Sequence, residues 1–128
     1  MHAALLCVLI AGLLPYLFTG VAKVTGPRYD NRDVRGWQAR LAGLPYRANA
    51  AHLNSFESFP LFAAAVLAAL ATGADAGRVN LLAVAYVLLR LAYGAVYLMN
   101  LASLRSLAWF GSIGCSIAIF VAALRAIP

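Results

Sequence analysis

The sequence has few charged residues and very few acidic ones. Only 11% of its 128 residues are charged, and four acidic residues stand against ten basic ones. Soluble proteins average about a quarter charged residues, whereas 64% of this chain is hydrophobic. A small soluble domain could not bury so much apolar surface, because its ratio of surface to volume is high. This composition excludes a soluble globular domain and indicates that the protein is embedded in a lipid bilayer.

Cysteines and metal-binding patterns are also scarce. The two cysteines, Cys7 and Cys115, both lie inside apolar stretches, where cysteine usually behaves as a small hydrophobic residue. No ligand spacing typical of a metal site occurs, so we expect no metal. The net charge of +6 is ordinary for basic loops beside anionic lipid headgroups, and we therefore expect membrane lipid and no nucleic acid as a partner.

Four apolar stretches are long enough to cross a bilayer, which takes roughly 20 residues each. They cover residues 3–23, 46–72, 79–100 and 106–126, and a basic loop occupies 24–45. The first stretch has neither a basic start nor a cleavage site, so we expect it to be retained as a span and not removed as a signal peptide. The sequence predicts an all-α membrane protein, with one four-helix, up-down transmembrane bundle over residues 1–128.

The basic residues are distributed unequally between the two ends of this bundle. One end carries Lys23, Arg28, Arg32, Arg35, Arg40, Arg47 and Arg105, and the other carries Arg78 and Arg125. Short cytoplasmic loops carry the excess of lysine and arginine in membrane proteins. We therefore expect the 24–45 loop in the cytoplasm and both termini outside, on the periplasmic face of a multi-pass protein in a bacterial inner membrane.

Polar side chains form a stripe on each of the two middle spans. At 100° per residue, Arg47, Asn54 and Ser58 fall within about 40° of arc, and Glu57 lies about 60° from Asn54. On the third span, five polar residues share about 80° of arc: Tyr86, Arg90, Tyr93, Tyr97 and Asn100. Lipid-exposed helices do not carry such faces, so they should face protein or a wet cavity.

The depths of two charged residues predict an ion pair. Glu57 lies roughly 16 Å and Arg90 roughly 15 Å from the loop-side ends of their spans at 1.5 Å per residue. Each charge alone would cost about 2.5–3.5 kcal/mol at mid-membrane on insertion scales, and pairing would remove much of that cost. We expect a polar funnel that opens toward the cytoplasm and ends at this pair, while the alternative is that these residues only join helices by hydrogen bonds.

The predicted funnel offers several positive charges and one negative charge. It would suit an anionic cytoplasmic molecule that also carries an amine, such as a small peptide with carboxylates. A basic residue at its mouth could stabilise a developing anion such as a thiolate, and the lipid side would admit an apolar second substrate. These features together describe a membrane conjugating enzyme.

Three segments carry a resemblance to a known family: "AHLNSFESFPLFAAAVLAAL", "RLAYGAVYL" and "LRSLAWF". The chain resembles the MAPEG family, the membrane-associated proteins in eicosanoid and glutathione metabolism, and its opening resembles uncharacterised bacterial members. The resemblance implies a homotrimer of four-helix bundles that binds glutathione as a co-substrate in cytoplasm-facing clefts between subunits. It assigns thiol activation to Arg105, and it assigns glutathione binding to Asn54, Glu57, Arg90, Tyr93 and Tyr97.

Two positions depart from the pattern of that family. Ala50 stands where an arginine is usual, and Arg47, one turn earlier, is the expected substitute as a binding residue. Trp109 stands where some members have tyrosine. The sequence thus favours a glutathione-dependent transferase or peroxidase that acts on an apolar electrophile. The alternatives are a non-catalytic membrane protein that binds or has a structural role, and a small cation exporter with Glu57 as its proton carrier.

Overall fold

Four long helices and one short helix build the protein. The computed structural model describes all residues, 1–128. The long helices are α1 (His2–Thr25), α3 (Gly43–Ala71), α4 (Ala76–Leu98) and α5 (Ala102–Arg125), and α2 (Val34–Ala39) is short. Each long helix is long and apolar enough to cross a membrane. The chain is therefore all-α with four candidate spans, as the sequence predicts, and it is an integral, multi-pass membrane protein.

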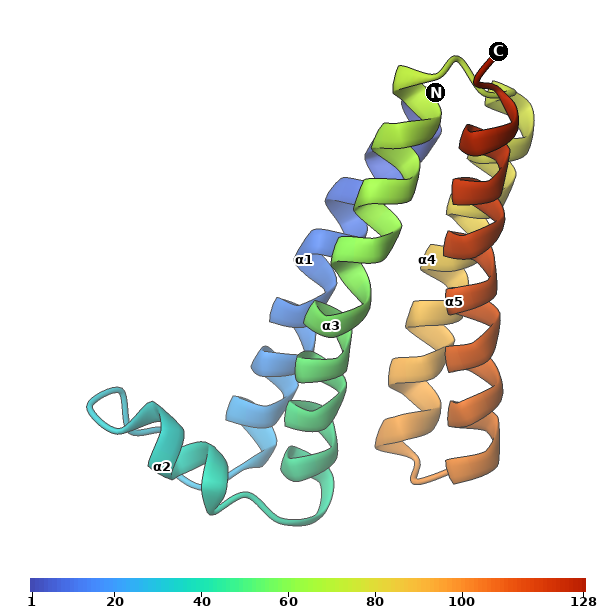
Figure 1. Cartoon of the computed structure of the whole chain (residues 1–128). Coiled ribbons are helices and arrows are strands. Elements are labelled where there is room, and N and C mark those ends of the chain that lie inside the picture. Colours follow the sequence, from blue (N-terminus) through green and yellow to red (C-terminus); the bar gives the residue numbers. More distant parts are fainter.

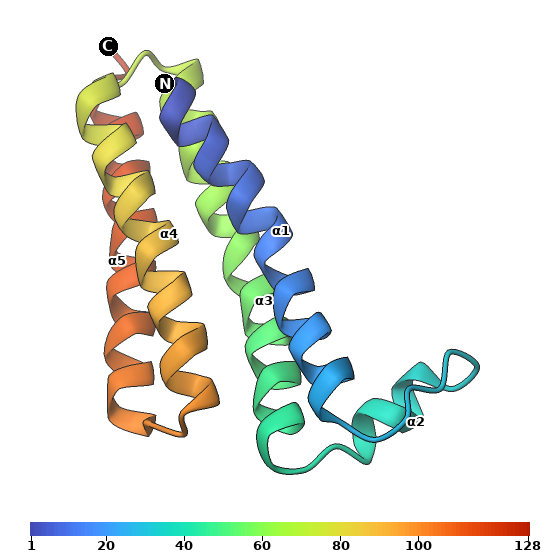
Figure 2. The ribbon, with the colours of Figure 1, turned by 180° about the vertical axis from the view of Figure 1, so that it is seen from behind.

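The helices pack as two pairs, α1 with α3 and α4 with α5 (Figure 1). Both termini and the α3–α4 turn lie at one end of the bundle, and the α1–α3 connection and the α4–α5 turn lie at the other (Figure 2). We call the second end the loop end. Seen from both sides, α2 and the residues before it project sideways from the foot of the α1/α3 pair.

Local signals in the sequence fix several helix ends. Asp33 accepts a hydrogen bond from the Gly36 N–H at 2.9 Å, and this N-terminal cap begins α2 inside what the sequence predicts as a continuous loop. Gly73 and Asn100 adopt left-handed φ angles of 68° and 60° immediately after α3 and α4, which closes each helix. Asn100 therefore ends α4 and does not belong to its polar stripe, contrary to the prediction.

The interior is built mainly from small apolar residues, and large ones cover the outside. Alanines of all four long helices contribute to the largest buried cluster, in which the rings of Phe62 and Tyr86 stack with centroids 3.7 Å apart. Leu81 and Leu107, by contrast, are 72% and 69% exposed. Since lipid is as apolar as leucine, small residues at helix contacts and large ones outside are the arrangement expected in a bilayer.

Candidate functional site

A pocket between α4 and α5 opens near the loop end. It has a volume of 380 Å³ and is lined by Tyr93, Tyr97, Arg105, Ser106, Trp109 and Phe110. The spacing of four between Tyr93 and Tyr97, and between Arg105 and Trp109, places each pair on one helix face. The short turn after α4 makes the two helices antiparallel neighbours, so both faces meet in one place. Three residues that the sequence assigns to the site, Tyr93, Tyr97 and Arg105, are brought together here.

Arg105 is the only charged residue that lines this pocket. Its guanidinium carbon lies 4.6 Å from the centre of the Tyr97 ring, and the Tyr97 ring in turn meets the Tyr93 ring edge to face at 5.6 Å. The single ion pair of the protein joins Arg40 to Asp33, so no carboxylate neutralises Arg105. The stacking holds the guanidinium in place, and its donors remain free for an anion in the pocket.

Arg90 connects this pocket to α3. It is 1% exposed, and its guanidinium carbon lies 4.2 Å from the centre of the Tyr93 ring. Its Nη1 donates to Asn54 Oδ1 at 3.0 Å and its Nη2 donates to Ser55 Oγ at 3.2 Å, while Nε has no partner. No carboxylate forms an ion pair with this buried guanidinium, which lies beside the pocket.

Comparison with protein families matches residues 3–125 to the MAPEG family. The match covers nearly the whole chain. The chain belongs to the MAPEG family. Comparisons with curated proteins and with solved structures give no match. As a MAPEG protein, it is a membrane protein of the family that acts in glutathione and eicosanoid metabolism.

The MAPEG chain does not form the predicted Glu57–Arg90 ion pair. Glu57 is exposed on the outer surface of the bundle, and its Oε2 accepts a hydrogen bond from Asn54 Nδ2 at 3.2 Å. Asn54 therefore stands between the two charges, with its amide oxygen on Arg90 and its amide nitrogen on Glu57. The Glu57 carboxylate and the Arg90 guanidinium are thus linked only by the hydrogen bonds that each makes with the neutral side chain of Asn54.

The reason for this difference is the register of α3 against α4. The observed contacts are Asn54 with Arg90 and Ser58 with Tyr86, whose hydroxyls lie 3.1 Å apart. Both contacts follow the same register of α3 against α4. This register is shifted by three residues, or about 4.5 Å along the helix, from the one that would pair Glu57 with Arg90. The predicted depths assume spans that begin at residue 46 and end at residue 100, whereas α3 begins at Gly43 and α4 ends at Leu98.

The remaining predicted residues lie outside the pocket of the single chain. The pocket lining comes from α4 and α5 only, so Asn54 and Glu57 of α3 do not share it. Arg47 lies at the loop end, where its Nε donates to the Leu98 carbonyl at 3.1 Å and so ties α3 to the last turn of α4. The predicted continuous funnel is thus divided into an α4/α5 pocket and an adjoining α3 stripe.

Sequence reasoning missed three residues of this region: Ser55, Ser106 and Phe110. Ser55 lies about 100° around the helix from Asn54, outside the arc of the polar stripe, and Arg90 reaches it because its side chain is long. Ser106 and Phe110 follow Arg105 and Trp109 directly. The aromatic pair Trp109–Phe110, whose ring centroids are 5.0 Å apart, was the one available signal for Phe110.

Proposed function

We propose that this MAPEG protein is a glutathione-dependent membrane transferase or peroxidase that acts on an apolar electrophile. The observation that carries the proposal is the uncompensated guanidinium of Arg105 in a pocket with two tyrosines. A thiol is a poor nucleophile until it loses its proton. A fixed cation in a site that excludes most water stabilises the resulting thiolate far more than the same cation in bulk water does.

Different residues of the pocket would bind the two reactants. Arg105, which stacks on the Tyr97 ring, would hold the thiolate of glutathione after its proton passes to water. Trp109 and Phe110 form the apolar wall, and Phe110 is 67% exposed on the lipid-facing outside of the bundle. An apolar substrate could therefore reach the pocket from the hydrocarbon without crossing an aqueous layer.

The reaction follows from a thiolate placed beside an apolar electrophile. In a transfer, the sulfur forms a bond to the electrophilic carbon, and the leaving group departs with its bonding electrons. In a peroxidase reaction, the sulfur attacks the outer oxygen of a hydroperoxide and the O–O bond breaks to release an alcohol. A second glutathione then reduces the sulfenic acid, which gives the disulfide and water. Both courses need the same Arg105–thiolate contact.

The α3 stripe would bind the rest of the glutathione molecule. The carboxylates of glutathione suit the positive charge of Arg47 on this stripe, which the buried charge of Arg90 on α4 supplements at longer range, and the amine of glutathione suits Glu57. Because Glu57 is exposed and an uncovered carboxylate is costly in lipid, a second subunit should cover it. We therefore propose a homotrimer in which each glutathione lies between the stripe of one subunit and its neighbour.

The proposed orientation places the loop end in the cytoplasm, where glutathione is found. Seven basic residues lie at this end, against Arg78 and Arg125 at the other, and such an excess favours the cytoplasmic side. Both termini, which lie together at the opposite end (Figure 1), would face the periplasm of a bacterial inner membrane. Labelling of a cysteine added at the C-terminus with an impermeant reagent tests this orientation.

Thiolate absorbance tests the function directly. Purified protein titrated with glutathione should develop the ultraviolet absorbance of a bound thiolate, and Arg105→Ala should abolish it. Arg125→Ala removes the same charge from the far end of the same helix and should leave the signal unchanged. Absence of any glutathione binding at millimolar concentration to the wild-type protein would refute the proposal.

A further inference from the structure

A second polar pocket lies in the connection between α1 and α2. It has a volume of 580 Å³ and is lined by Arg28, Tyr29, Asp30, Asn31, Arg32 and Arg40. Three of its six lining residues are arginines and one is an acid. It lies in the part of the chain that projects sideways from the bundle (Figures 1 and 2), away from the α4/α5 pocket.

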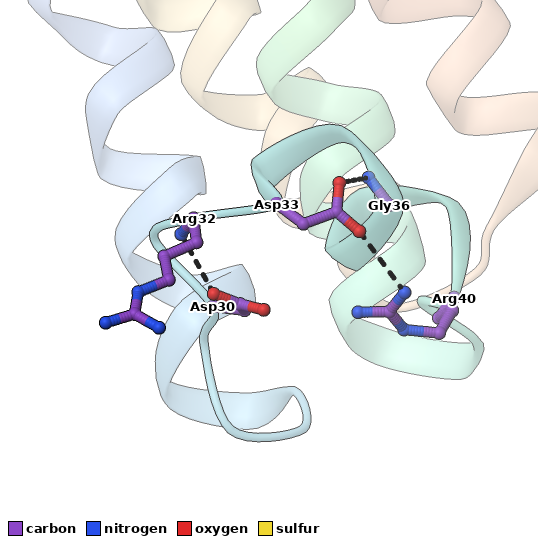
Figure 3. Close-up of polar contacts among 5 residues, drawn as sticks. All are labelled: Asp30, Arg32, Asp33, Gly36 and Arg40. Atoms are coloured by element: carbon purple, nitrogen blue, oxygen red, sulfur yellow. Dashed lines mark hydrogen bonds and ion pairs between the residues drawn. The ribbon is translucent and has the colours of Figure 1, made fainter.

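Both carboxylates of this connection are already engaged within it (Figure 3). Asp30 Oδ1 accepts a hydrogen bond from the backbone N–H of Arg32 at 2.8 Å. Asp33 caps α2 through one oxygen, and its other oxygen lies 3.7 Å from Nη1 of Arg40. The guanidinium groups of Arg28 and Arg32 therefore have no ion-pair partner, and the pocket keeps an excess of positive charge.

A buried tryptophan fixes the shape of this pocket. Trp37 is 3% exposed, and its Nε1 donates to the Pro27 carbonyl at 3.0 Å. Its ring packs edge to face on Tyr29 at 5.1 Å, and the Lys23 ammonium lies 3.9 Å from the centre of the same Tyr29 ring. Packing of the Trp37 ring on Tyr29, which lines the pocket, thus fixes one side of the pocket.

A neighbouring pocket of mixed polarity joins this pocket to an apolar groove on α1. Tyr29 also lines a neighbouring pocket of 300 Å³, and Tyr16 is shared between that pocket and an open groove on α1. Leu17, Val21 and Val24 line the groove. A cationic pocket at the end of a span, followed by an apolar groove that runs along the span, has the polarity profile of a phospholipid.

We propose that the pocket binds the phosphate of an anionic phospholipid, with an acyl chain along the α1 groove. Arginine guanidinium groups bind phosphate oxygens through paired hydrogen bonds. The pocket follows the last turn of α1 and therefore lies at the depth of the headgroups. A soluble phosphate would gain the same charge contacts but nothing from the groove, so the lipid is the favoured source. Such a lipid would fix the projecting connection against the membrane surface.

Lipid binding to Arg28→Gln/Arg32→Gln tests this site. Native mass spectrometry of the whole protein in detergent, titrated with phosphatidylglycerol, should show retention by the wild type. Each arginine near an anionic headgroup adds about 1 kcal/mol, so the double variant should bind about 30-fold more weakly. Arg28→Lys/Arg32→Lys keeps both charges but lacks the paired guanidinium donors, so binding should return in part, and this recovery separates lost charge from misfolding.

The matched control is Arg35→Gln/Arg78→Gln, which removes two charges outside the pocket. Arg35 belongs to the same projecting segment but donates to Gln38 instead. The control removes only one charge from this end of the bundle, that of Arg35, and should bind no more than about fivefold more weakly than the wild type. Equal weakening in the control would show diffuse attraction and overturn the site. Equal retention of phosphatidylcholine would also overturn it, and so would displacement of the lipid by millimolar inorganic phosphate, which would identify a soluble ligand.

Discussion

Asn54→Ala should destabilise the protein because Asn54 joins the buried guanidinium of Arg90 to Glu57. The variant leaves Nη1 of Arg90 without its acceptor at 3.0 Å, beside an Nε that already lacks one. Hydrogen bonds between membrane helices contribute about 0.6 kcal/mol on average and up to about 1.7, and bonds to charged groups are the stronger ones. We expect a loss of about 1.5 kcal/mol in the free energy of unfolding.

Arg90→Met isolates this interaction. Removal of the guanidinium leaves Asn54 on Glu57, and it leaves Ser55 Oγ donating to the Ala51 carbonyl at 2.8 Å, so no buried donor loses its partner. Replacing both partners of a buried hydrogen bond by apolar groups of similar shape can be nearly neutral. In the Arg90→Met background, Asn54→Ala should therefore cost close to nothing.

Reversible unfolding in sodium dodecyl sulfate, followed by circular dichroism, measures the four proteins of this double-mutant cycle. Asn49→Ala is the control, because Asn49 lies on the same helix and makes no side-chain hydrogen bond. The free energy of unfolding of Asn49→Ala should lie within about 0.5 kcal/mol of that of the wild type, as it does for substitutions that remove no specific contact. An equal cost of Asn54→Ala with and without Arg90 would refute the reasoning.

Three further substitutions test the packing and the helix capping of the bundle. A methyl group added at Gly94 would collide with the buried ring of Phe18, so Gly94→Ala should lower the free energy of unfolding by about 1–3 kcal/mol. A methyl group added at Gly114 meets no atom within 4 Å. Gly114→Ala should therefore raise the free energy of unfolding by up to about 1 kcal/mol through helix propensity. Unfolding in sodium dodecyl sulfate compares the two glycine variants. Asn80→Ala removes the acceptor of the Ala4 N–H, which now donates to it at 3.0 Å, and should cost about 1 kcal/mol, as loss of a helix cap does. Hydrogen exchange of the Ala4 amide should then speed up, and an unchanged rate would contradict this role.

The four spans could be predicted from the sequence because length and apolar composition determine them. A helix in lipid must satisfy its backbone hydrogen bonds internally, so each long apolar stretch has only one available structure. The helix ends were harder to predict from the sequence, because they depend on the geometry of the adjoining turns. Gly43 takes a φ of 64° at the start of α3, and α3 then includes the first turn of what the sequence predicts as loop.

The site could be predicted in part. Tyr93, Tyr97 and Arg105 follow from helical spacing and a short turn, both of which are local properties of the chain. The contact of Arg90 with Asn54 depends on the register of two helices, which is set by packing along their whole length. A register difference of three residues therefore separates the observed contact of Arg90 with neutral Asn54 from the predicted ion pair with Glu57.

The α4/α5 pocket is encoded by one uninterrupted segment, from Tyr93 to Phe110. Selection can therefore retune its chemistry by point changes within a single hairpin, while the α1/α3 pair keeps its own sequence. Under the proposed function, a library randomised at Ser106, Trp109 and Phe110 would alter substrate preference without disturbing the Asn54–Arg90 contact. The hairpin is the natural unit for exchanging specificity between homologues.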